Sequence, residues 1–130
     1  MNIRLQLLFC ALALGTFGCA SSTDVVKQER RLAREDYLAA RVEAQRDIES
    51  GQLAYEVYGF LLPYFSECEQ LLCDRYRIHL RVVGGCVVDE SVRAHAKGYN
   101  EIMVPEIERR FGSNLWAQTE ADAKRIYDSK

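Results

Sequence analysis

Two short stretches of this chain have the composition of β-strands, and a helical segment separates them. Residues Leu53 to Phe60 are rich in Tyr, Val, Leu and Phe and lie between Gly51 and Pro63, which is typical of a strand. Residues Ile78 to Val83 are rich in β-branched side chains and end at Gly84-Gly85, which predicts a second strand. A strand, a short helix and a strand form a βαβ unit, so we expect parallel strands joined by a right-handed crossover.

The other segments have helical patterns. Asp24 to Ser50 contains no Gly or Pro, so we expect one long helix there, ended by Gly51. Three further segments with a helical apolar period extend from Pro63 to about Tyr76, from Asp89 to Phe111, and from Ser113 or Asn114 to the C-terminal end. The second of these contains Pro105, which predicts a kinked helix or two abutting helices.

These elements predict a small single α/β domain with a long N-terminal helix, one βαβ unit with two parallel strands, and C-terminal helices. Two strands alone make a marginal sheet. We therefore expect either that the helices wrap the sheet closely, or that a further strand of this chain or of a second subunit completes it.

The first 18 residues have the pattern of a secretory signal. Arg4 supplies a positive charge, and the apolar stretch from Leu5 to Phe17 ends among small residues, as in segments that direct export. This stretch is shorter than the ~20 apolar residues of a membrane-spanning helix. The pattern leaves three outcomes open: cleavage with lipidation, ordinary secretory cleavage, and an uncleaved anchor.

The residues around the expected cleavage point favour lipidation. The segment Leu14-Gly15-Thr16-Phe17-Gly18-Cys19 resembles the lipobox of bacterial lipoproteins, in which a small residue precedes an invariant cysteine. Thr16 stands where Leu is usual in this family, and Phe17 is bulky for its position. The resemblance implies that Cys19 is acylated and becomes the first residue of the mature chain.

The same resemblance divides the chain and places it in the cell. It implies a signal peptide at residues 1–18, a lipidated cysteine and polar tether at residues 19–23, and a globular domain at residues 24–130. It also implies an envelope protein that a lipid on Cys19 anchors to a membrane. Because Ala20 is not the Asp that marks retention in the inner membrane, we expect the outer membrane, facing the periplasm, in a cell with two membranes.

Removal of the first 18 of the 130 residues leaves 112 residues, and the loss of Arg4 changes the net charge from −2 to −3. A chain of this size can form one domain with a real core. Nucleic-acid binding needs a concentrated basic face, which this acidic balance does not favour. The net charge also gives no support for electrostatic docking to anionic lipid, so the acyl chains must hold the protein.

The chain has five cysteines, of which Cys10 leaves with the signal and Cys19 carries the lipid. The other three allow at most one internal disulfide in an oxidising compartment. Cys68 and Cys73 are five residues apart on one helix, which puts their Cα atoms ~8.5 Å apart, beyond the ~7 Å limit for a bridge. Cys86 is therefore the common partner. Because Cys68 lies on the apolar stripe of its helix, we predict a Cys68–Cys86 bridge and a free Cys73.

A ligand site, if present, is expected where the two parallel strands end, since ligands of open parallel sheets bind there. Parallel pairing brings the loops at Tyr58-Gly59 and Gly84-Gly85-Cys86 to one edge, and Asn100 lies on the helix that follows. Cys86 precedes a helix N-terminus, which can stabilise a thiolate. The simpler interpretation is that the glycines form tight turns and that Cys86 is in a disulfide.

No metal or cofactor site is predicted. His79 and His95 are the two histidines, and no spacing of carboxylates or thiolates points to a shared metal ion, so we expect structural roles for both. No catalytic set of residues is recognisable either. We therefore expect a non-enzymatic envelope lipoprotein that binds a protein partner, for example as an immunity protein or inhibitor. The alternative is a small-ligand-binding or enzymatic α/β domain that uses the strand-end loops around Cys86.

Overall fold

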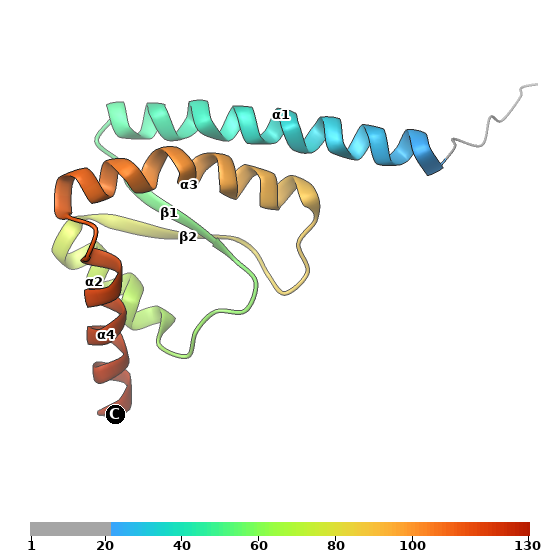
Figure 1. Ribbon diagram of the computed structural model, residues 1–130. Coiled ribbons are helices and arrows are strands. Elements are labelled where there is room, and N and C mark those ends of the chain that lie inside the picture. Colours follow the sequence, from blue (N-terminus) through green and yellow to red (C-terminus); the bar gives the residue numbers. More distant parts are fainter. Residues whose placement is uncertain (1–21) are drawn as a thin grey trace, which may run out of the picture.

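The computed structural model describes residues 22–130, and the predicted signal peptide and Cys19 lie outside this range. The described elements are α1 (Ser22–Glu49), β1 (Leu53–Tyr58), α2 (Phe65–Tyr76), β2 (Ile78–Gly84), α3 (Glu90–Phe111) and α4 (Leu115–Asp128). Their order is the predicted one (Figure 1). α1 begins at Ser22 rather than Asp24, so the end of the predicted tether is helical.

The sheet is the predicted βαβ unit. β1 and β2 are parallel, with Leu53 opposite Ile78 and Val57 opposite Val82. The register shifts after Val57, so that Tyr58 lies opposite Gly84. Within residues 22–130 no third strand joins the sheet, and the helices cover it instead.

Two helical layers enclose the sheet, as Figure 1 shows. α1 and α3 lie side by side on one face, where Glu56 and Arg81 of the strands contact them. α2 and α4 pack together on the other face, where Tyr55 of β1 stacks against Trp116 of α4. Successive side chains of each strand point to opposite faces of the sheet, so alternate residues contact the α1–α3 layer and the α2–α4 layer.

The core forms where α1, α3 and the sheet meet. Its largest fully buried side chains are Tyr99, Ile78, Met103, Ile107 and Leu115. α1 contributes only small residues, Ala40 and Ala44, which allow the two helices to approach closely. At Gly98 of α3 an added Cβ would lie 2.3 Å from the carbonyl oxygen of Tyr37 in α1. The close contact between the two helices therefore requires Gly98.

Several local signals predict the boundaries correctly. The Asp89 carboxylate accepts a hydrogen bond of 2.8 Å from the backbone N–H of Val92 and so caps α3. Gly51 has a positive φ of 78° directly after α1, the left-handed conformation that glycine adopts without strain. α3 is one helix that contains Pro105, and not two abutting helices.

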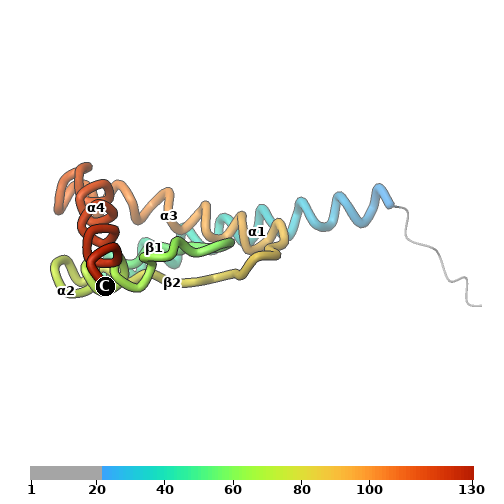
Figure 2. The backbone as a smooth tube through the Cα atoms, turned by 90° about the horizontal axis from the view of Figure 1, so that it is seen from below, coloured from blue at the N-terminus to red at the C-terminus, as the bar shows by residue number. Residues whose placement is uncertain are grey.

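The first turns of α1 extend beyond the rest of the molecule (Figures 1 and 2). Every residue from Ser22 to Leu32 is exposed, and the first buried residue of α1 is Ala33. α2 and α4 lie at the opposite end of the molecule (Figure 1). The long helix therefore separates the residues next to Cys19 from the α2–α4 layer.

Candidate functional site

The two strand-end loops meet, as parallel pairing predicts. The backbone N–H of Gly59 donates to the carbonyl oxygens of Gly84 and Gly85 at 3.3 and 3.1 Å. Gly59 has a φ of 90°, which favours glycine at this position. At Gly84 an added Cβ would lie 2.3 Å from the side chain of Val88. These glycines thus serve the local backbone packing of the strand ends.

Asn100 closes the outer edge of β1. Its Oδ1 accepts from the backbone N–H of Glu56 at 2.9 Å, and its Nδ2 donates to the carbonyl oxygen of the same residue at 2.8 Å. The amide side chain therefore makes both hydrogen bonds that a neighbouring strand would make at this residue. This arrangement covers an edge that would otherwise be open, and it occupies the polar atoms of Asn100.

The predicted strand-end residues do not converge on one pocket. Tyr58 and Asn100 line a hollow of about 340 Å³ beside β1. Cys86 is exposed and does not line that hollow. Two of the three groups on which the ligand-binding alternative depends therefore share a hollow, and the third, Cys86, lies outside it.

The three described cysteines are free thiols in the structure, so the Cys68–Cys86 bridge remains a prediction. Cys68 is partly buried, and burial together with the negative charges of Glu120 and Glu67 raises the pKa of its thiol. A raised pKa keeps the group in its less nucleophilic protonated form. Cys73 Sγ lies 4.0 Å from His79 Nδ1.

A polar network that the sequence did not reveal joins α1 and α3 to the sheet. The carboxylate of Glu56, on β1, is buried and lies 2.9 Å from His95 Nδ1, whose Nε2 lies 3.4 Å from Glu43 of α1. Arg81 of β2 contacts Glu43 at 3.3 Å and Asp47 at 2.9 Å. The network gives the buried carboxylate of Glu56 a partner in His95 and gives Arg81 two carboxylate partners, and buried polar groups require such partners.

Tyr99 completes this network, because its hydroxyl donates a hydrogen bond of 2.6 Å to Oδ2 of Asp47. Burial of the ring, and then this hydrogen bond, raise the pKa of Tyr99 above its ordinary value, so the phenol remains protonated. The signal in the sequence was a Glu at the centre of the apolar strand Leu53–Tyr58, with an Arg at the matching point of the second strand. Within the part of the chain that the structure describes, no group of three or more His, Cys, Asp or Glu side chains is arranged to hold a metal ion.

The most pronounced apolar depression lies on the other face of the sheet, and we call it the apolar groove. It has a volume of about 340 Å³. Its floor is the sheet and its walls are α2, α4 and the loop before α2, with the lining residues Tyr55, Val57, Leu62, Phe65, Cys68, Leu72, Leu80, Trp116, Thr119 and Glu120. The rings of Tyr55 and Trp116 are 5.2 Å apart at their centroids.

Two polar atoms at the apolar groove lack partners. Thr119 is 2% exposed, and neither its Oγ1 nor the Nε1 of Trp116 has a hydrogen-bond partner. Both atoms are buried, and buried polar groups are nearly always paired, so these two gain partners from a bound molecule only if the groove opens around it. Glu120 accepts a hydrogen bond of 2.9 Å from the hydroxyl of Tyr64 at the rim, and this bond raises the pKa of Tyr64.

The loop beside the groove adds exposed apolar surface. Phe60 is 87% exposed and Leu62 is 52% exposed. Leu61 is also exposed, at 44%. β1 ends at Tyr58 and not at the predicted Phe60, and α2 begins at Phe65 and not at Pro63. The loop between them is therefore longer than predicted and contains these three residues.

Comparisons with protein-family models, with curated proteins and with solved structures found no match for this chain. Among residues 22–130, no helix combines the length and the apolar character that crossing a bilayer requires.

Proposed function

We propose that this protein is an envelope lipoprotein whose domain binds a protein partner through the apolar groove. The observation that carries the proposal is the combination of an apolar depression with unpaired hydrogen-bonding atoms at Trp116 and Thr119. Apolar depressions with a few placed polar groups are the usual form of a binding site. The lipobox-like residues before Cys19 supply the anchor.

The chemistry of the groove defines what it accepts. A volume of about 340 Å³ suits one or two large apolar side chains rather than an extended cofactor. Trp116 Nε1 is a donor only, and the Thr119 hydroxyl can donate as well. The partner therefore presents an apolar side chain next to a hydrogen-bond acceptor such as a backbone carbonyl, the combination that a protein segment provides. Buried aromatic anchors of this kind dominate binding energy at protein interfaces.

The position of the groove relative to the anchor supports the same function. Cys19 precedes the first residue of α1 by three residues, which span at most about 11 Å when extended. The α2–α4 layer that forms the groove lies at the other end of the molecule (Figure 1). A tether at one end and a binding surface at the other leave the groove accessible to a partner in the surrounding compartment.

The strand-end edge offers less support for the ligand-binding or enzymatic alternative. Asn100 is engaged with the backbone of Glu56, and Cys86 lies outside the hollow that Asn100 shares with Tyr58. A filled strand-end edge and an apolar depression elsewhere are the features that favour a binding module over the alternative.

The anchor is tested by the variant Cys19→Ser, expressed in a bacterium that processes lipoproteins. We expect the wild-type chain in the outer-membrane fraction and the variant in the soluble periplasmic fraction, with the same far-UV circular dichroism for both. Retention of a processed Cys19→Ser chain in the membrane fraction would contradict lipidation. The groove is tested separately, by site-specific photo-cross-linking from Leu62 at its rim.

A further inference from the structure

One flank of the molecule gathers cations, although the net charge of the chain is negative. Lys27, Arg31, Arg34, Leu38 and Arg41 follow one another at spacings of four, three, four and three residues in α1. Residues at these spacings lie on one face of a helix. Arg30 borders this stripe, because it lies four residues before Arg34 and three after Lys27.

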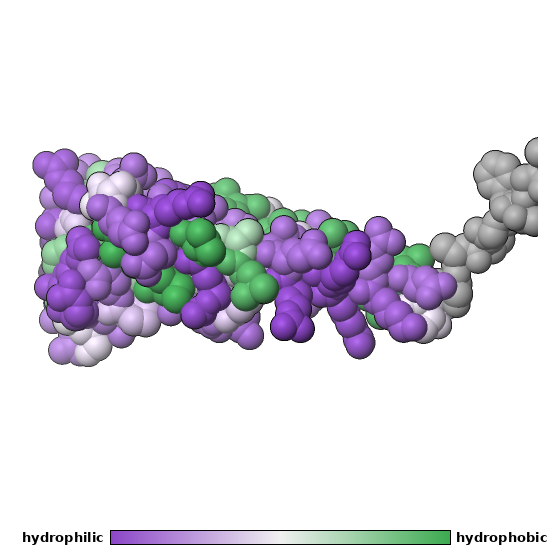
Figure 3. All heavy atoms as spheres, turned by 90° about the horizontal axis from the view of Figure 1, so that it is seen from above, coloured by the Kyte–Doolittle hydropathy of each residue, from purple (hydrophilic) through white to green (hydrophobic). Residues whose placement is uncertain are grey.

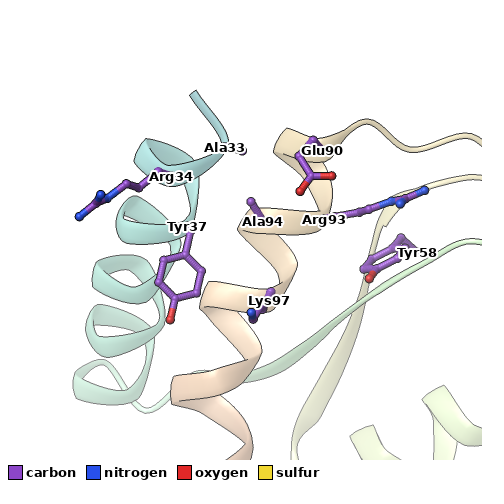
Figure 4. Close-up of a pocket in the computed structure, with 8 residues that line it drawn as sticks. All are labelled: Ala33, Arg34, Tyr37, Tyr58, Glu90, Arg93, Ala94 and Lys97. Carbon is purple, nitrogen blue, oxygen red and sulfur yellow. The ribbon is translucent and has the colours of Figure 1, made fainter. Parts of the chain in front are cut away.

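Helix α3 extends this face. A depression of about 460 Å³ between α1 and α3 is lined by Arg34 of α1 and by Arg93 and Lys97 of α3 (Figure 4). In Figure 4, Arg34 points outward from α1, and Arg93 extends toward Tyr58 at the end of β1. We call these seven cations the basic flank: Lys27, Arg30, Arg31, Arg34, Arg41, Arg93 and Lys97.

Most cations of the basic flank are not neutralised. Three of them have carboxylate partners: Arg31 contacts Glu35 at 3.7 Å, and Arg41 and Lys97 contact Glu101 at 3.3 and 3.9 Å. The only further carboxylate that lines the depression is that of Glu90. The remaining four cations, Lys27, Arg30, Arg34 and Arg93, are exposed and form no ion pair among the described residues.

Exposed apolar side chains lie among these cations. Leu38, within the stripe, is 51% exposed, and Val42, four residues further along, is 52% exposed. Figure 3, which views the molecule from above, shows a largely hydrophilic surface interrupted by apolar patches. A helical face with basic residues and a few apolar ones is typical of a segment that lies on a membrane surface.

We infer that the basic flank rests on a surface of anionic phospholipid. This inference depends on the proposed lipid anchor, because a lipid on Cys19 would hold the start of α1 within about 11 Å of the bilayer. Cations so close to the surface each add to membrane affinity. Glu29 and Asp36 of α1 line a separate depression, together with Asp89 and Glu90. The distribution of charge therefore supports electrostatic docking, which the net charge alone did not favour.

The test uses a chain that begins at Ala20, so that no acyl group contributes to binding. It retains every described element, since these lie within residues 22–130. Its partition into phosphatidylglycerol–phosphatidylcholine vesicles is measured by cosedimentation and compared with vesicles of phosphatidylcholine alone. We expect binding to the anionic vesicles to be stronger by about tenfold or more, and to weaken as salt is added.

Two triple variants with the same change in charge separate the basic flank from net charge. The test variant carries Lys27→Gln, Arg30→Gln and Arg34→Gln. The control variant replaces Arg46, Arg77 and Lys124 by Gln. These cations are also exposed and unpaired among the described residues, but they lie outside the basic flank, near the end of α1, between α2 and β2, and on α4. We expect the test variant to lose about tenfold in binding to anionic vesicles, and the control to lose less than about twofold.

Three results would overturn the inference: equal binding to both kinds of vesicle, equal losses in the two variants, or no binding at all. The last result would direct attention to an acidic protein as the target of the basic flank. Because the tested chain lacks Cys19, none of these results bears on lipidation. Conversely, a Cys19→Ser chain that stays in the membrane fraction would contradict the lipid anchor. It would leave the vesicle test of the basic flank unaffected.

Discussion

Replacement of Asn100 by Ala should destabilise the fold, because its side chain completes the edge of β1. The change removes two hydrogen bonds, of 2.9 and 2.8 Å, to the backbone of Glu56. Glu56 is only 4% exposed, so water replaces these bonds poorly. Each bond contributes about 0.5–1.5 kcal/mol, and the better helix propensity of Ala returns roughly 0.5 kcal/mol. The expected net loss in the free energy of unfolding is about 1–2 kcal/mol.

The assay is urea unfolding followed by far-UV circular dichroism, with thermal unfolding as a second measure. A loss of this size in a domain of about 100 residues lowers the midpoint temperature by roughly 5–10 °C. The matched control is Asn114→Ala, since the side chain of Asn114 makes no capping hydrogen bond at the start of α4. Its loss should stay below about 0.5 kcal/mol. Equal stability of Asn100→Ala and the wild type would refute the structural role and return Asn100 to the list of ligand-binding candidates.

Two further predictions concern packing and charge. Gly98→Ala should lower the free energy of unfolding by about 1–3 kcal/mol, because the new Cβ would lie 2.3 Å from a backbone oxygen of α1. The control is Gly85→Ala, since Gly85 has open space around it. Equal urea midpoints for the two variants would contradict the close contact. Glu106 accepts hydrogen bonds from Arg109 and Arg110, which lower its pKa to about 2. Because the folded pKa lies below the unfolded one, its stabilising effect is present above about pH 4.5 and is lost as the pH falls toward 2. Glu106→Gln should therefore flatten the dependence of the urea midpoint on pH in this range, and an unchanged slope would argue against these bonds.

The sequence predicts elements well where the signal is local. Gly51 and Asp89 mark helix boundaries through backbone conformation and capping, which depend on a few neighbouring residues. The β-branched runs at Leu53 and Ile78 likewise produce parallel strands. These signals are sufficient for the element order and for the α/β class.

Features that depend on the packing of distant residues were not predictable in the same way. Asn100 seemed available for a ligand because its partner, the backbone of Glu56, lies 44 residues away. Trp116, the largest apolar side chain of α4, is partly exposed and lines the apolar groove, while its neighbour Leu115 is 2% exposed. A one-residue difference in helix phase decides which of these side chains enters the core, and only the tertiary arrangement fixes it.

The account depends above all on the apolar groove as a protein-binding surface, and site-specific photo-cross-linking in intact cells tests this most directly. A photoreactive residue at Leu62, on the rim of the groove, is compared with one at Val42 on α1, since both side chains are 52% exposed. We predict a discrete protein adduct from position 62 and none from position 42. The added substitution Val57→Lys in the groove should abolish the adduct while the circular dichroism stays unchanged. Absence of an adduct at position 62, or adducts of equal yield at both positions, would contradict the proposed function.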